Sequence, residues 1–197
     1  MKKTTLMVMA VAFIAFSFTS IKKTNYKVNT ETSKINWKGF KPTGSHYGTI
    51  HLSNGNFIIN DDKIIGGEFT IKMNSILDLD MPADNEYNAK LVGHLKSEDF
   101  FYVEKYPNGG FQIKGTEKKG EKTLIKGELT LKGITHPVSF LANVKIDNGQ
   151  LAFKSETFKV DRSKWNIRYK SKSFFDDLKD KFIEDDMEIS IEVMAIK

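Results

Sequence analysis

The chain has 197 residues, of which 30 are lysine or arginine and 25 are aspartate or glutamate, so its formal net charge is +5. It contains no cysteine, which excludes disulfide bonds, a cysteine nucleophile and a lipid-modified N-terminal cysteine. Only Arg162 and Arg168 are arginines, and the lysines are scattered along the polar faces of the expected strands. Nucleic-acid sites usually cluster arginine and lysine with aromatic side chains, so we expect no nucleic-acid partner.

The N-terminal segment has the three parts of a secretory signal peptide. Lys2 and Lys3 precede an apolar run over residues 6–16, and small residues follow as far as Ser20. An uncleaved anchor is the alternative, but the run is shorter than the roughly 20 residues of a membrane-spanning helix. We expect residues 1–20 to be removed, and the mature protein to be periplasmic or secreted in a bacterium, without stable membrane insertion.

Residues 21–197 are expected to form a single domain, because no linker rich in proline, glycine and serine divides them. Apolar and polar side chains alternate with a period of two in several stretches, as Phe69, Ile71 and Met73 do with their polar neighbours. Successive side chains of a strand point to opposite faces, so each stretch has one apolar face. The predicted strands are residues 26–30, 34–40, 47–52, 55–60, 63–74, 109–118, 122–132, 137–147, 150–161 and 187–196. Many strands in one small domain indicate a sandwich or a barrel.

Three glycine-containing segments predict hairpin turns between these strands. They are residues 53–56, 119–121 and 147–149. Asn-Gly pairs suit turns that need positive φ, and the twist of such turns matches that of antiparallel strands.

Two interruptions of the strand pattern predict helices. Asp84 is a candidate N-cap for a helix that runs to about Leu95, with Tyr87 and Leu91 on its apolar face. The second predicted helix covers residues 171–181. Helices beside a barrel commonly close one of its ends, and we expect that position here.

Several segments, in this order, resemble the YceI family of exported lipid-binding proteins. The best matches are residues 94–107 (HLKSEDFFYVEKYP), 127–138 (GELTLKGITHPV) and 158–167 (FKVDRSKWNI). The resemblance extends from about Tyr26 to the C-terminus, although residues 176–186 are longer and more acidic than expected of the family.

The resemblance implies a fold and a class of ligand. The expected fold is all-β: a lipocalin-like, extended eight-stranded antiparallel β-barrel with one or two short helices. The expected ligand is a polyisoprenoid, quinone-like or fatty-acyl lipid held in the apolar interior. The family implies no catalytic residues and no cofactor. A homodimer is left open.

If the interior holds a lipid, the apolar face of each strand must line it. The predicted ligand-binding side chains of the wall are Trp37, Phe69, Ile71, Met73, Phe111, Ile113, Leu129, Leu131, Phe140, Ala142 and Ile191. Those predicted for the mouth are Leu91, Leu95, Phe100, Phe101 and Trp165. The alternative is that these side chains fill a solid core, as most apolar strand faces do.

The histidines do not predict a metal site. His46 and His51 are five residues apart, so on one regular strand they would point to opposite faces. His94 is expected to hydrogen-bond near a helix end, and His94 and Arg162 are also candidates to meet a ligand head group. A hydrolase of lipid-like esters with His94 or His136 as base is a further alternative, although no catalytic motif supports it.

The acidic run over residues 176–186 suggests calcium. It lacks the alternating ligands and central glycine of an EF-hand loop. With Lys179 and Lys181 interleaved, it is expected to be a solvated surface instead.

Overall fold

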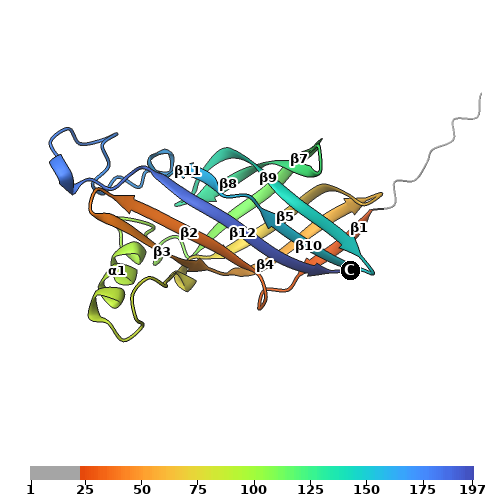
Figure 1. The fold of residues 1–197 in the computed structure, drawn as a ribbon, viewed down its shortest axis with the longest axis horizontal. Helices are drawn as coiled ribbons and strands as arrows, with labels where there is room; N and C mark the ends of the chain where they lie inside the picture. Colours follow the sequence, from red (N-terminus) through yellow and green to blue (C-terminus); the bar gives the residue numbers. More distant parts are fainter. Residues whose placement is uncertain (1–22) are drawn as a thin grey trace, which may run out of the picture.

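In the computed structural model, which describes residues 23–197, twelve strands hydrogen-bond into a single antiparallel sheet (Figure 1). The predicted signal peptide lies outside the described residues. The strands are β1 (Thr24–Val28), β2 (Lys34–Lys41), β3 (Gly44–Ile50), β4 (Leu52–Asn60), β5 (Lys63–Lys72), β6 (Leu77–Asp78), β7 (Asn108–Lys119), β8 (Lys122–Leu131), β9 (Ile134–Asp147), β10 (Gln150–Ser155), β11 (Phe158–Asp161) and β12 (Asp186–Ile196).

The sheet closes on itself because β1, at one end of the strand order, also pairs with β12. β1 pairs with β4 on one side and with β12 on the other, where Val28 lies opposite Ala195. In three places, two consecutive strands together make one strand of the barrel: β1 with β2, β3 with β4, and β10 with β11. The result is a closed eight-stranded antiparallel barrel, with the two-residue β6 added beside β3. The predicted fold class is confirmed.

Two of the three predicted hairpin turns are present. Gly120 and Gly149 have φ of +60° and +77° in the two-residue loops that join β7 to β8 and β9 to β10. The prediction for residues 53–56 is wrong, because β4 runs through them without turning. An irregular register between Leu52 and Asn54 absorbs the extra residue, which is how a β-bulge lets a strand continue.

The first predicted helix is present as α1 (Glu86–Lys96), at one end of the barrel (Figure 1). Its N-cap is Asn85 and not Asp84: the Asn85 side chain accepts a hydrogen bond from the Tyr87 amide at 2.8 Å. Tyr87 does not belong to the apolar face, since it is 62% exposed while Leu95 is buried. Within residues 23–197, no helix is both long and apolar enough to cross a bilayer.

The second predicted helix is wrong. Residues 171–181 contain turns and one short 3-10 helix, Lys179–Lys181. The hydroxyls of Ser171 and Ser173 donate to the Asp185 carboxylate at 2.8 and 2.7 Å, and the Ser173 amide donates to the Ser171 hydroxyl. Such side-chain bonds compete with the helical backbone ladder, and they hold residues 171–185 as an irregular strap at the end of the barrel that carries α1 (Figure 1).

Gly127 allows two strands to approach closely, and this makes it a test of the packing. A Cβ atom there would lie 2.4 Å from the Phe111 ring and 2.6 Å from the Gln112 carbonyl oxygen. We expect Gly127→Ala to lower the free energy of unfolding in urea by about 1–3 kcal/mol, because the wall cannot yield without strain. Gly115→Ala is the control, since no atom lies within 4 Å of its added Cβ. Equal effects of the two changes would contradict the packing described.

Candidate ligand-binding cavity

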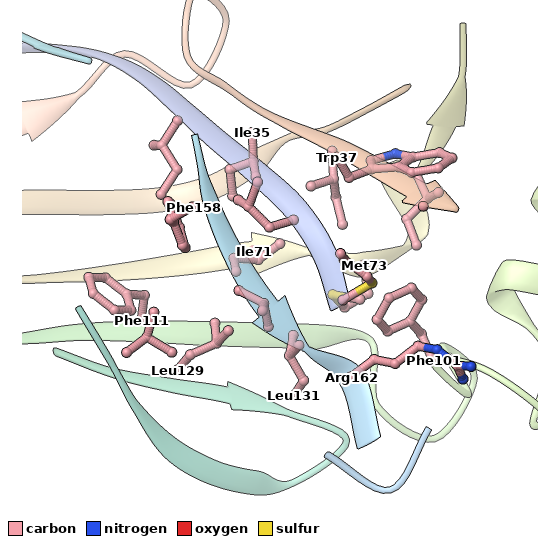
Figure 2. Close-up of a pocket in the computed structure, with 18 of the residues that line it drawn as sticks. Ile35, Trp37, Ile71, Met73, Phe101, Phe111, Leu129, Leu131, Phe158 and Arg162 are labelled. Atoms are coloured by element: carbon pink, nitrogen blue, oxygen red, sulfur yellow. The ribbon is translucent and has the colours of Figure 1, made fainter. Parts of the chain in front are cut away.

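An apolar cavity occupies part of the barrel interior. It has about 200 Å³ of space open to water-sized molecules. An apolar cavity of about 150 Å³ is enough to bind benzene, so this space accommodates a stretch of hydrocarbon. Figure 2 shows side chains projecting into it from different strands, such as Ile71 of β5 and Leu129 and Leu131 of β8.

All of the predicted ligand-binding side chains except Ala142 and Trp165 line this cavity. Ala142 is fully buried in a part of the core that the cavity does not reach. The Trp165 ring lies behind the wall, where its Nε1 donates to the Leu129 carbonyl at 3.1 Å and the ring forms a T-shaped pair with His136. Those two placements were wrong.

The end of the barrel away from α1 is solid. Its side chains are buried and do not border the cavity: Tyr26, Val28, Ile59, Ile64, Ile125, Ala142, Leu151 and Ala195. They come from strand ends near the loops at residues 61–62, 120–121 and 148–149, so they lie at the end that carries the C-terminus (Figure 1). The interior is therefore both packed and hollow, in different halves.

A belt of five phenylalanines marks the boundary between the two halves. Successive ring centroids along it are 4.9, 6.4, 5.7, 6.4 and 5.4 Å apart, in the order Phe57, Phe69, Phe111, Phe140, Phe153 and back to Phe57. Aromatic pairs at such spacings stabilise one another beyond simple burial. All five rings border the cavity. Two residues from Phe57, Phe140 and Phe153, toward the solid half, lie the buried side chains of Ile59, Ala142 and Leu151. This aromatic belt therefore forms the floor of the cavity.

Sequence reasoning did not assign Phe57 and Phe153 to the site. Phe153 lies in the strand predicted over residues 150–161, so its parity in that strand could have assigned it. Phe57 follows Gly55 and Asn56, which were interpreted as a turn, and the direction of its side chain could not be read through a bulge.

The mouth of the cavity lies at the end of the barrel that carries α1. Lys41 and Glu184 are exposed lining residues there, and the half-buried His46 also borders the cavity. From α1 and the turn after it, Leu91, Leu95, Phe100 and Phe101 border the same space. The mouth thus joins a charged rim to an apolar interior.

The comparisons with known proteins agree with this geometry. The model of the YceI-like domain matches residues 26–195. This chain belongs to the YceI-like family.

Curated relatives of this YceI-like chain come from several bacteria. A UPF0312 protein of Photorhabdus laumondii is 29% identical over 98% of this chain and 97% of its own length. Protein YceI of Escherichia coli O157:H7 is 26% identical over 72% of this chain and 73% of its own.

Solved structures share the fold at lower identity. BcnA of Burkholderia cenocepacia superposes with a TM-score of 0.67 at 21% identity, over 85% of this chain and 99% of BcnA. A polyisoprenoid binding domain from Saccharophagus degradans has a TM-score of 0.61 at 13% identity, over 87% and 97% of the two chains.

Arg162 is a buried cation at the cavity, and its donors are used within the protein. It is 1% exposed. Its guanidinium donates to the carbonyls of Glu184, Ile167 and Ile183 at 3.1, 2.7 and 2.9 Å, and pairs with Asp185 at 3.2 Å. Burial lowers the pKa of Arg162, and the nearby carboxylate of Asp185 opposes that shift. Arg162 therefore holds the strap in place.

The remaining sequence candidates have structural partners. The His94 ring lies 3.2 Å from Asp99 and packs edge-on against Tyr169. The His136 ring bonds to the Lys164 carbonyl at 2.9 Å.

The acidic run is mostly exposed. Within this run, the Asp185 carboxylate pairs with Arg162 and accepts hydrogen bonds from two serine hydroxyls.

Removing the Arg162 cation tests its structural role. Arg162→Met would leave three carbonyls without their donor and Asp185 without its cation. We expect the free energy of unfolding to fall by about 3 kcal/mol in urea denaturation, because unpaired buried polar groups are costly. Arg168→Met, at an exposed arginine, is the control and should cost less than about 0.5 kcal/mol. A small effect at Arg162 would contradict this role.

Proposed function

We propose that this protein binds a long-chain lipid, a polyisoprenoid or a molecule with a similar quinone-like or fatty-acyl chain, inside the barrel. The observation that carries the proposal is the apolar cavity of about 200 Å³ between the aromatic belt and the mouth. The Saccharophagus relative, described as a polyisoprenoid binding domain, supports the same class of ligand. The role proposed is binding and transport or sequestration, without catalysis.

The energetics of burial are sufficient for such binding. Each buried methylene contributes roughly 0.8 kcal/mol, so about ten supply about 8 kcal/mol, which corresponds to about micromolar affinity before costs. Lost translational freedom and ordering of the chain offset part of this gain. Apolar burial depends on area and not on identity, so several lipids of similar chain should bind.

We further propose that the protein acts outside the cytoplasm. The support is the arrangement of Lys2, Lys3 and the apolar residues 6–16 that precedes the barrel.

One experiment examines both proposals. The full-length gene is expressed in its native host, and the purified protein is extracted with organic solvent for mass spectrometry. We expect about one prenyl or acyl lipid per protein, and an intact mass that lacks about the first 20 residues. Lipid-free protein that also takes up no added isoprenoid would contradict lipid binding. Protein retaining its N-terminus in the cytoplasmic fraction would contradict export.

A matched pair of substitutions tests whether the interior is the site. Ile71 lines the cavity, whereas its neighbour Lys72 is exposed on the outer face. Ile71→Arg should abolish isoprenoid uptake, since an unpaired charge in an apolar space is costly. Lys72→Glu should bind normally. Identical behaviour of the two variants would place the ligand elsewhere.

A change that adds bulk without charge provides a second test of the cavity. The Leu129 side chain projects into the cavity and is only partly buried (Figure 2). Leu129→Trp should keep the folded state, by circular dichroism, and lower isoprenoid affinity at least tenfold. Undiminished binding would contradict occupation of this cavity.

A further inference from the structure

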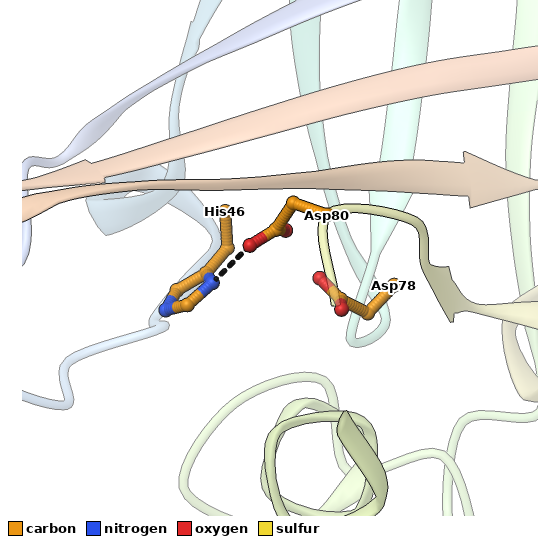
Figure 3. Close-up of side chains that lie close together, drawn as sticks. All are labelled: His46, Asp78 and Asp80. Atoms are coloured by element: carbon orange, nitrogen blue, oxygen red, sulfur yellow. Dashed lines mark hydrogen bonds and ion pairs between the residues drawn. The ribbon is translucent and has the colours of Figure 1, made fainter. Parts of the chain in front are cut away.

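Three side chains that are typical metal ligands lie together beside the mouth of the cavity. His46 comes from β3, Asp78 from β6, and Asp80 from the loop that follows β6 (Figure 3). One ligand atom from each lies within 4.8 Å of the other two. His46 also lines the cavity, so this cluster and the lipid space share one residue.

The pairing of β6 with β3 assembles the cluster, and Gly48 makes that pairing possible. Gly48 lies opposite Asp78 in the register. A Cβ atom at Gly48 would be 1.8 Å from the Leu77 carbonyl oxygen, so only glycine lets the two strands approach this closely. The approach places both carboxylates next to the imidazole.

The hydrogen bonds of the cluster are incomplete. Asp80 accepts from the Tyr47 amide at 2.8 Å, and its second oxygen lies 3.0 Å from His46 Nδ1. Asp78 Oδ2 accepts from the Met81 amide at 3.1 Å and from Asn88 at 3.2 Å. Asp78 Oδ1 is buried and has no hydrogen-bond partner among the described residues.

This orphan oxygen requires a partner. Asp78 is 6% exposed, and leaving a buried charged acceptor unpaired is unfavourable. Its carboxylate faces that of Asp80 (Figure 3). A cation between the two carboxylates would remove the repulsion and satisfy the oxygen.

We propose that His46, Asp78 and Asp80 bind one divalent transition-metal ion, with Zn²⁺ as the representative ion. One imidazole with two carboxylates is a ligand set for such ions, whereas Ca²⁺ and Mg²⁺ prefer oxygen alone. Two ligands about 2.0–2.1 Å from a tetrahedral ion are about 3.3 Å apart. The 3.0 Å between His46 Nδ1 and Asp80 Oδ2 is close to that spacing. The ion takes the place of the Nδ1 proton.

Three protein ligands leave a coordination position open on a tetrahedral ion. Both His46 and Asp80 are partly accessible, with side chains 28% and 18% exposed, so water can reach that position. The site lies at the rim of the cavity and does not depend on whether a lipid occupies it.

Metal titration tests the proposal. The purified protein, without a histidine tag and after treatment with a chelator, is titrated with Zn²⁺ by calorimetry. We expect one ion per protein and a higher Tm when the ion is bound. The visible spectrum of the Co²⁺ form should show nitrogen and oxygen coordination.

Variants assign the ligands. His46→Gln and Asp78→Asn should each weaken Zn²⁺ binding at least tenfold, and His46→Gln should alter the Co²⁺ spectrum. His94→Gln with Asp99→Asn is the matched control, because that His-carboxylate pair lacks a second carboxylate partner and should leave binding unchanged. Circular dichroism checks that each variant is folded. Absence of Zn²⁺ binding, or binding that neither ligand variant weakens, would overturn the proposal.

Discussion

Closure of the sheet through the pairing of β1 with β12 is the constraint on which the rest of the structure depends. Once the sheet is closed, every second side chain of each strand must share one enclosed volume. The size of those side chains then decides whether the volume is filled. At the end with the C-terminus, aliphatic side chains meet across the barrel, while beyond the aromatic belt the opposing walls stay apart.

The hollow half needs a different kind of support from the packed half. An irregular chain lies at its end, and such a chain cannot satisfy its own carbonyls as a strand or helix does. Arg162 supplies donors to three of those carbonyls and a positive charge to Asp185. A buried cation is costly unless it is fully paired. Here the paired Arg162 stabilises the end of the barrel where the cavity leaves less hydrophobic packing.

The fold and the cavity wall were predictable because strand parity is a local property. Phe69, Ile71 and Met73 show their common face directly in the sequence, and all three line the cavity. Ala142 has the correct parity and still lies outside the site, because parity gives the direction of a side chain and not its depth along the barrel. Trp165 was misplaced because it follows no strand pattern.

Other features depend on contacts that are distant in sequence. The strap was mistaken for a helix because the bonds from Ser171 and Ser173 to Asp185 join its two ends. The group at His46 was not foreseen, because Asp78 and Asp80 lie more than thirty positions later and reach it only through β6. Sequence spacing alone does not show that these three side chains lie close together in the fold.

Within residues 23–197, the aromatic belt closes the cavity on one side, and the cavity opens at the mouth beside α1. A lipid that bound as proposed would enter tail first, because its polar end would lose solvation in an interior of hydrocarbon. If a lipid binds as proposed, a tail no longer than the cavity leaves the polar end at the rim, near Lys41, His46 and Glu184. The depth of the cavity from rim to floor therefore limits the length of the tail that can be fully enclosed.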